Sequence, residues 1–184
     1  MLKALLGRQI DKMERQFDYD ASYMRQMLRL SPGTFMKFGM VTQLVDRKAA
    51  PLEALAAAGI AGTLTEDCGP CTQISVDLAA QQGVDPRVLR AILAGDEAAM
   101  GEAASLGWRF ARASLARDME AADRLRDEIV RRWGEKGLLA VSLALTTARM
   151  YPTLKYALGH GKACSRVTVG GQPTPVTHLA PLAA

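Results

Sequence analysis

The sequence predicts an all-α fold that forms a single domain. Strong helix formers such as Ala and Leu are abundant among its 184 residues, whereas the aromatic residues that favour strands make up only 5%. Hydrophobic residues account for 49% of the chain and charged residues for 23%, a balance typical of a domain that buries its own core. We therefore expect one bundle of packed helices.

Apolar residues at helical spacing begin at the N-terminus. The first helix is expected within residues 1–20, where the apolar positions are Leu2, Leu5, Leu6, Met13 and Phe17. A second helix follows, with apolar positions at Tyr23, Met24, Met27 and Leu28. Both patterns indicate faces that pack against other helices.

Proline and capping residues mark where the next helices begin. Ser31 is expected to cap a helix that has Pro32 at its first position and continues over residues 34–46. Pro51 then opens a helix that runs to about residue 61. These two helices bring the chain to its cysteine pair.

Two short helices have clear start and stop signals. Pro70 suits the first turn of a helix, where its missing amide proton costs nothing, and Gly83 ends that helix. Asp85 caps the next helix, Pro86 starts it and Gly95 ends it. Cysteines 68 and 71 are therefore expected at a helix N-terminus.

The second half of the chain is expected to be helical up to a C-terminal tail. The helices are expected over residues 97–113, 119–133 and 136–150, and from Pro152 to about 164. Residues 165–184 are rich in Pro, Gly and Thr, so we expect a tail that is disordered or laid against a neighbouring subunit. This divides the chain into an N-terminal helix (1–20), a helical domain (21–164) and the tail.

The charge pattern argues against nucleic acid and membrane as partners. The net charge of +4 comes from 23 basic and 19 acidic residues that interleave, as in residues 117–132, which is typical of a solvated helix face. No apolar stretch reaches the roughly 20 residues that cross a bilayer, and the N-terminus lacks the build of a secretory signal. We therefore expect a cytoplasmic protein with no membrane span.

A close pair of cysteines stands out in "EDCGPCTQIS" (66–75). In the cytoplasm such a pair is expected to be catalytic, redox-active or metal-binding. A helix N-terminus stabilises a thiolate, although Glu66 and Asp67 oppose this effect. The spacing of Cys68 and Cys71 also allows a small disulfide to form and break. Two buried structural cysteines remain the alternative.

Metal binding and a thioredoxin fold fit the cysteine pair less well. A structural zinc site needs four ligands, and the other Cys and His residues are Cys164, His160 and His178, so no metal or cofactor is expected. The tetrad "CGPC" is the signature of thioredoxins, which place it after a strand. Here an Ala-rich helix and Asp67 precede it.

A longer segment resembles a helical family. In "LAAAGIAGTLTEDCGPCTQISVDLAAQQGVDPRVLRAILAGD" (55–96), a helix precedes a C-x-x-C at the start of the next helix, followed by a Gly turn and a short helix. Residues 110–159 and the opening "YMRQMLRLSPGTFMKFGMV" are similar to the other parts of the same pattern. Over roughly residues 20–160 the chain resembles the carboxymuconolactone decarboxylase and alkylhydroperoxidase D family.

The resemblance implies an alkylhydroperoxidase D-like (AhpD-like) helical bundle that assembles as a homo-oligomer, commonly a trimer or hexamer. In the peroxidase branch, the cysteine at the position of Cys71 attacks a hydroperoxide. The cysteine at the position of Cys68 then forms a disulfide with it, and a thiol reductant returns both cysteines to thiols. The decarboxylase branch works without a cysteine pair, which makes a lactone decarboxylase less favoured here. The remaining alternative is a non-enzymatic helical oligomer whose cysteine pair senses redox state or is merely structural.

The sequence departs from the family pattern at its proton relay. Where the family has His four residues after the second cysteine and Glu twelve before the first, this chain has Ser75 and Ala56. Glu53 or Glu66 could replace the base, and Ser75 supplies a hydroxyl near the right place. The helix-end effect favours Cys68 as the nucleophile and the family precedent favours Cys71. The catalytic candidates are therefore Cys68, Cys71, Glu66 and Ser75.

Overall fold

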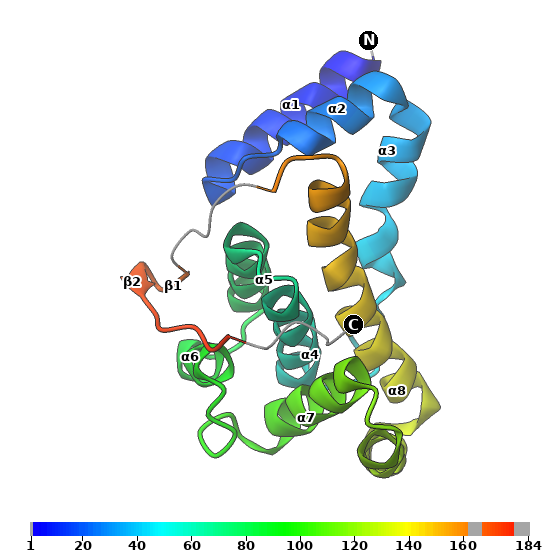
Figure 1. Ribbon diagram of the computed structural model, residues 1–184, viewed down its shortest axis with the longest axis vertical. Coiled ribbons are helices and arrows are strands. Elements are labelled where there is room, and N and C mark those ends of the chain that lie inside the picture. Colours follow the sequence, from blue (N-terminus) through cyan, green and yellow to red (C-terminus); the bar gives the residue numbers. More distant parts are fainter. Residues whose placement is uncertain (1, 162–166, 179–184) are drawn as a thin grey trace.

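The computed structural model describes residues 2–161 and 167–178, and almost all of its regular structure is helical (Figure 1). The elements are α1 (Leu2–Phe17), α2 (Ser22–Leu30), α3 (Pro32–Gly39), the 3₁₀ helix η1 (Val41–Leu44), α4 (Leu52–Thr65), α5 (Gly69–Gln81), α6 (Pro86–Ala94), α7 (Glu102–Ala116), α8 (Met119–Ala157), β1 (Thr168–Val169) and β2 (Gln172–Pro173). The all-α class is confirmed apart from the short strand pair. Among the described helices, none combines the length and apolarity needed to cross a bilayer.

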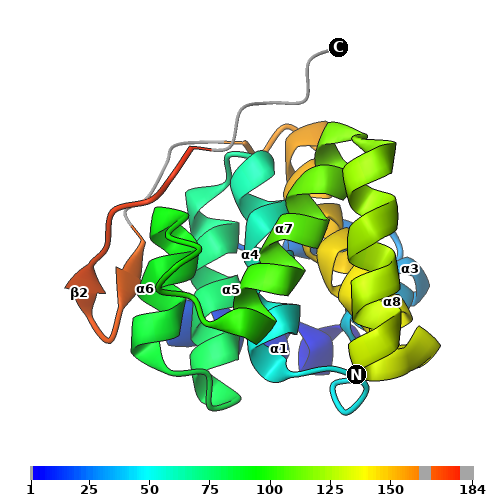
Figure 2. The same cartoon turned by 90° about the horizontal axis from the view of Figure 1, so that it is seen from below.

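Helix α4 lies at the centre of the bundle, packed against α5, α7 and α8 (Figure 2). Its small side chains let the neighbouring helices approach closely. A Cβ atom added to Gly107 of α7 would lie only 2.4 Å from the carbonyl oxygen of Ala54. Ile60 of α4 and Trp108 of α7 are fully buried in the core that results. The Ala-rich sequence of α4 therefore sets the spacing of the bundle.

The predicted caps of α3 and α6 are confirmed. The side-chain oxygen of Ser31 accepts a hydrogen bond from the amide of Thr34, and Asp85 accepts one from the amide of Arg87. Gly95 ends α6 in the left-handed conformation, with φ of 70°. Helix α3 is shorter than predicted, because it ends at Gly39 and the chain continues as the 3₁₀ helix η1. Helix α4 is longer, reaching Thr65 instead of residue 61.

The predicted breaks in the second half of the chain are partly wrong. Helix α7 begins at Glu102, because the residues from Asp96 onward form turns first. Gly134 interrupts α8 with non-helical backbone angles (φ 71°, ψ 178°). This break lies in the gap between the helices predicted over residues 119–133 and 136–150. Pro152 does not interrupt it: this residue is buried, and the helix continues to Ala157, short of the predicted end. Proline lacks an amide donor, so the helix loses one backbone hydrogen bond here, and the packing of its buried face compensates for that loss.

The N-terminal helices cover one end of the bundle. Helices α1 and α2 lie side by side across that end (Figure 1). From them α3 leads to η1, which contacts α8, and Phe38 of α3 packs edge-on against Tyr151 of α8 with 4.8 Å between ring centroids. Leu6 and Ile10 of α1 are buried in an apolar cluster that also contains Tyr23, Cys68 and Cys71. The described N-terminal residues, 2–20, are thus an integral part of the surroundings of the cysteine pair.

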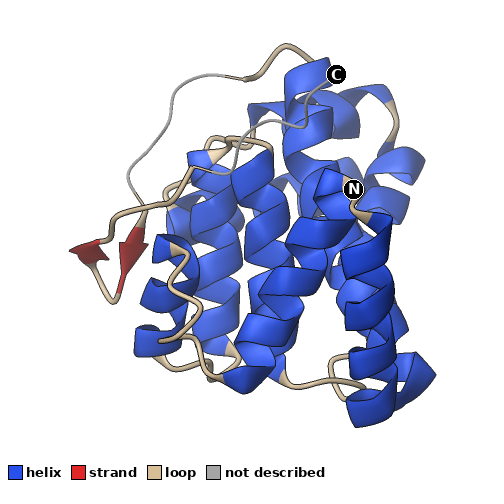
Figure 3. Ribbon diagram, turned by 60° about the horizontal axis from the view of Figure 1, so that its bottom comes forward, coloured by secondary structure: helices blue, strands red, loops and turns tan. Residues whose placement is uncertain are grey.

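The C-terminal segment packs on its own chain over residues 167–178. Strands β1 and β2 pair in an antiparallel hairpin at the edge of the molecule (Figure 3). Val167 and Val169 are buried, and the Gln73 side chain of α5 accepts a hydrogen bond from the Thr168 amide at 2.6 Å. For these residues the predicted tail, disordered or laid against a neighbour, is wrong, because its valines find an apolar site on α5 and α6. The rest of that tail lies outside the described residues.

Candidate functional site

The cysteine pair lies at the N-terminus of α5, as predicted. Helix α4 ends at Thr65, and Asp67 turns the chain with φ of 48°, a left-handed conformation that Asp tolerates better than most residues. Cys68 is then the N-cap of α5, Pro70 lies in its first turn and Cys71 follows. The local signals of the sequence are sufficient to build this turn.

The two thiols are in direct contact. Their Sγ atoms are 2.7 Å apart, so one S–H group donates to the other sulfur, and both cysteines are reduced. Each cysteine is only 4% exposed. The pair is positioned to form an intramolecular disulfide, with its sulfurs shielded from bulk solvent.

The surroundings of the pair place the negative charge on Cys68. The pKa of Cys68 is lowered to about 7, mainly by the hydrogen bond from the Cys71 thiol, with smaller contributions from the Cys71 amide, Lys155 and Tyr156 that together outweigh the effect of burial. The same hydrogen bond, together with burial, raises the pKa of Cys71 above its ordinary range. Above about pH 7 the pair therefore holds one proton, mainly on Cys71.

Tyr19, which contacts Cys71, and Lys155, which lies over the Tyr19 ring, are two neighbours of the pair that sequence reasoning missed. Lys155 is 3% exposed, and among the described residues it is the one buried side chain with a charge. Its ammonium lies 4.9 Å from the centroid of the Tyr19 ring. The Tyr19 hydroxyl lies 3.8 Å from Cys71 Sγ. The sequence signal that could have identified Lys155 is its place within the apolar pattern at the end of α8. No local signal marks Tyr19.

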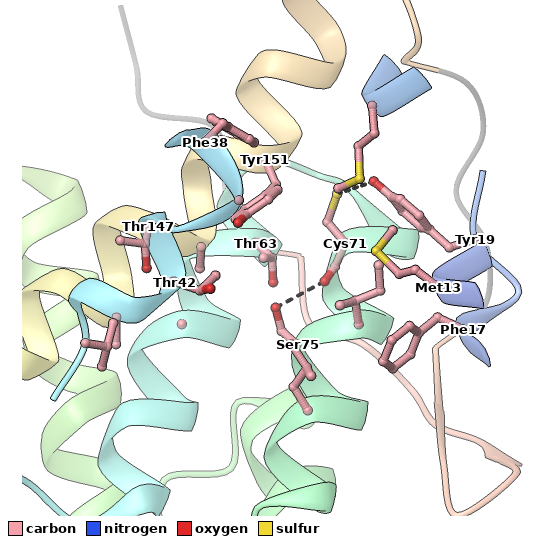
Figure 4. A pocket seen from close by; sticks show the side chains of 18 of the residues that line it. Met13, Phe17, Tyr19, Phe38, Thr42, Thr63, Cys71, Ser75, Thr147 and Tyr151 are labelled. Carbon is pink, nitrogen blue, oxygen red and sulfur yellow. Dashed lines mark hydrogen bonds between the residues drawn. The ribbon is translucent and has the colours of Figure 1, made fainter. Parts of the chain in front are cut away.

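A large apolar cavity lies against Cys71. It has a volume of about 720 Å³, lies between the N-terminal helices and the bundle, and is lined mostly by apolar and aromatic side chains. Figure 4 shows Cys71 and Ser75 on one wall, with Met13, Phe17 and Tyr19 beside them and Tyr151 opposite. Of the cysteines described, Cys71 is the one that lines this cavity. A small apolar molecule held here would face that sulfur.

The other two predicted catalytic residues lie close to the pair without touching a sulfur. Glu66 pairs with Arg149, which donates from Nε to a carboxylate oxygen at 2.7 Å. The Ser75 hydroxyl donates to the backbone carbonyl oxygen of Cys71 at 3.1 Å (Figure 4). Ser75 and Ala56 both line the cavity, so these two positions face the same space.

Within residues 2–161 and 167–178, no cluster of three or more His, Cys, Asp or Glu side chains could hold a metal ion. His160 is hydrogen-bonded to Gln26, and Cys164 lies outside the described residues. Comparisons with protein-family models, curated proteins and solved structures find no match to this chain.

Proposed function

We propose that this protein is a thiol-dependent peroxidase or disulfide oxidoreductase of the alkylhydroperoxidase D type, with Cys68 and Cys71 as its redox pair. The observation that carries the proposal is the contact between two free thiols, 2.7 Å apart, one of which, Cys71, lines an apolar cavity. A reducing compartment such as the cytoplasm suits this chemistry, because cellular reductants there return the pair to its dithiol form.

The reaction uses both thiols. A cysteine thiolate attacks the distal oxygen of a hydroperoxide, a sulfur–oxygen bond forms, the oxygen–oxygen bond breaks and an alcohol leaves. The second sulfur displaces the hydroxyl of the resulting sulfenic acid, which gives a disulfide and water. A dithiol reductant then converts the disulfide back to two thiols. The close contact of the sulfurs favours the second step, because the resolving thiol is already in place.

The cavity favours Cys71 as the sulfur that meets the peroxide. Cys71 faces the cavity, and its neighbour Cys68 holds the charge at rest. Attack by Cys71 requires the shared proton to move to Cys68 across their contact, against the resting preference for charge on Cys68. Cys68 is then the resolving thiol. This division agrees with the roles that the family resemblance implies.

Hydroperoxide turnover tests the proposal. The reduced protein is mixed with cumene hydroperoxide and dithiothreitol, and both peroxide consumption and the Cys68–Cys71 disulfide, seen by peptide mass spectrometry, are followed. We expect catalytic turnover that Cys71→Ser abolishes and Cys68→Ser reduces to slow reaction through the external thiol. Cys164→Ser serves as the matched control for loss of a cysteine.

The alternative functions give different results in this experiment. Stoichiometric formation of the disulfide without turnover would identify a redox sensor. Thiols that resist oxidation by cumene hydroperoxide altogether would mark a structural pair and contradict the peroxidase.

A further inference from the structure

Reduction of an alkyl hydroperoxide requires an acid near the attacked bond. The oxygen that leaves is an alkoxide, a strong base, and a positioned proton donor is worth about 100-fold or more in rate. Neither predicted candidate is placed for this task. Ser75 uses its proton on the Cys71 carbonyl oxygen, and Glu66 is held by Arg149.

Tyr19 is a hydroxyl in contact with the reactive sulfur. Its oxygen lies 3.8 Å from Cys71 Sγ, within hydrogen-bonding distance for sulfur, and both residues line the cavity (Figure 4). A peroxide whose distal oxygen meets Cys71 places its other oxygen one short bond away. The leaving oxygen therefore comes within reach of the Tyr19 hydroxyl.

The turn that carries Tyr19 is well held. Its backbone amide donates to the carbonyl oxygen of Glu14, and the Glu14 carboxylate accepts from the amide of Ala21 and pairs with Arg25. The ring packs edge-on against Tyr23, with 6.4 Å between centroids. These contacts fix the hydroxyl relative to the sulfur, as a catalytic acid requires.

We propose that Tyr19 is the catalytic acid that protonates the leaving alkoxide when Cys71 attacks an alkyl hydroperoxide. This inference rests on the proposed peroxidase function and adds a residue that the family relay does not contain. A phenol reaching in from the N-terminal segment would take over the task of the missing His.

Each proton in the step has a donor and an acceptor. The Cys71 thiolate bonds to the distal oxygen, the oxygen–oxygen bond breaks, and its electron pair goes to the alkoxide oxygen. Tyr19 gives that oxygen its proton, which leaves an alcohol, a Cys71 sulfenic acid and a phenolate. Cys68 then passes its proton to the phenolate and attacks the sulfenic sulfur. The hydroxide that leaves takes a proton from solvent and becomes water.

The environment of Tyr19 favours its protonated form at rest. Burial raises the pKa of Tyr19 above that of an ordinary phenol, so the hydroxyl keeps its proton in the resting protein. The Lys155 ammonium, 4.9 Å from the ring centroid, is placed to attract the negative charge that develops on the phenolate.

Two oxidants with different leaving groups test the proposal. Cumene hydroperoxide releases an alkoxide that needs a proton, whereas peracetic acid releases acetate, a weak base that does not. We expect Tyr19→Phe to slow oxidation of the reduced protein by cumene hydroperoxide about 100-fold and to change oxidation by peracetic acid little. Tyr151→Phe removes another phenol hydroxyl from the wall of the same cavity, opposite Cys71, and it should keep the wild-type ratio of the two rates.

Three outcomes would overturn the assignment of Tyr19. One is a Tyr19→Phe protein as fast as wild type with cumene hydroperoxide. Another is equal slowing with both oxidants, which would show that the ring only packs. If Tyr19→Phe does not fold, 3-fluorotyrosine at position 19 keeps the shape and acidifies the phenol, and an unchanged ratio of the rates would then overturn it. Wild-type protein that reduces neither oxidant would instead refute the proposed function itself.

Discussion

At the scale of single residues, the cysteine pair is asymmetric although its two members are chemically identical. Cys68 is the N-cap and accepts a hydrogen bond that stabilises its charge, while Cys71 lies one turn into the helix beside the cavity. Glu66 was expected to oppose thiolate formation, and its pairing with Arg149 offsets that repulsion. The resting charge and the substrate-facing position thus belong to different sulfurs.

The first prediction concerns the pH dependence of Cys68 alkylation. Because its pKa is lowered to about 7, the thiolate is present above that pH and is lost as the pH falls through it. We expect the rate of iodoacetamide labelling at Cys68, followed by mass spectrometry, to have its midpoint near that value. Cys71→Ala removes the main cause and should move the midpoint towards about 8.5, the ordinary value.

Ser75→Ala is the control for this titration, because that hydroxyl contacts a carbonyl oxygen and no sulfur. It should leave the midpoint where it is. An identical midpoint for the wild type and Cys71→Ala would show that the hydrogen bond between the thiols does not set the pKa.

The second prediction concerns the missing relay. Ser75 and Ala56 line the same cavity as Cys71, so Ser75→His and Ala56→Glu together would place an imidazole and its acidic partner beside the sulfur. We expect the double variant to turn over cumene hydroperoxide about 10-fold faster than wild type, with a smaller gain for Ser75→His alone. Steady-state assays of both variants measure this, with Cys71→Ser as the blank. A folded double variant as slow as the blank would contradict the peroxidase assignment.

The sequence predicted the cysteine site only where its signals are local. Pro70 and Gly83 punctuate α5, and these signals suffice to place both cysteines at its start. Tyr19 reaches Cys71 across 52 positions of the chain, and the contact of Lys155 with the Tyr19 ring spans an even longer stretch. Such contacts depend on how the helices pack, which a pattern of neighbouring residues does not encode.

At the scale of elements, the close approach of α7 to α4 depends on Gly107. A Cβ atom there would lie 2.4 Å from the carbonyl oxygen of Ala54, and backbone on a central helix cannot easily move aside. Gly59 of α4 is a useful contrast, since its added Cβ would meet the carbonyl oxygen of Ala144 at an ordinary 3.6 Å.

The third prediction follows from these two glycines. Alanine normally stabilises a helix relative to glycine by about 1 kcal/mol, and Gly59→Ala should show up to that gain. Gly107→Ala should instead lower the free energy of unfolding by about 1 to 3 kcal/mol, because overpacking outweighs helix propensity. Urea denaturation measures both. Equal stability of the two variants would mean that α4 and α7 can separate at little cost.

Element boundaries were predictable where a residue fixes its own backbone. Asp85 and Gly95 do so, and α6 has the predicted ends. Pro152 was expected to begin a new helix, but the buried face of α8 outweighs the lost hydrogen bond. The strand pair was missed because β1 and β2 are two residues each, and Gln73, far away in sequence, holds β1 in place.

At the scale of the whole molecule, several large apolar side chains remain on the surface. The exposed set includes Leu2, Leu5, Leu30, Met36, Met40, Leu44, Met119 and Leu139. Most of these residues belong to the N-terminal helices and η1, which also cover the cavity. Contact with further copies of the chain would remove such surface from water.

The fourth prediction is therefore a homo-oligomer, a trimer or a multiple of it. Sedimentation velocity at micromolar concentration should show a species of at least three times the chain mass of 19.8 kDa. A single species near the mass of one chain would contradict it. Repeating the run with the oxidised protein separates assembly from the state of the cysteine pair.

The different surroundings of the two sulfurs have a consequence for steady-state kinetics. Cys71 lines the cavity, while Cys68 lies near Tyr156, a side chain exposed at the surface. If the peroxide reacts with Cys71 in the cavity and the reductant attacks Cys68 from the surface, the two substrates bind at different sites and do not compete. Double-reciprocal plots at several reductant concentrations would then be parallel lines, and a large excess of peroxide would not inhibit by blocking the reductant.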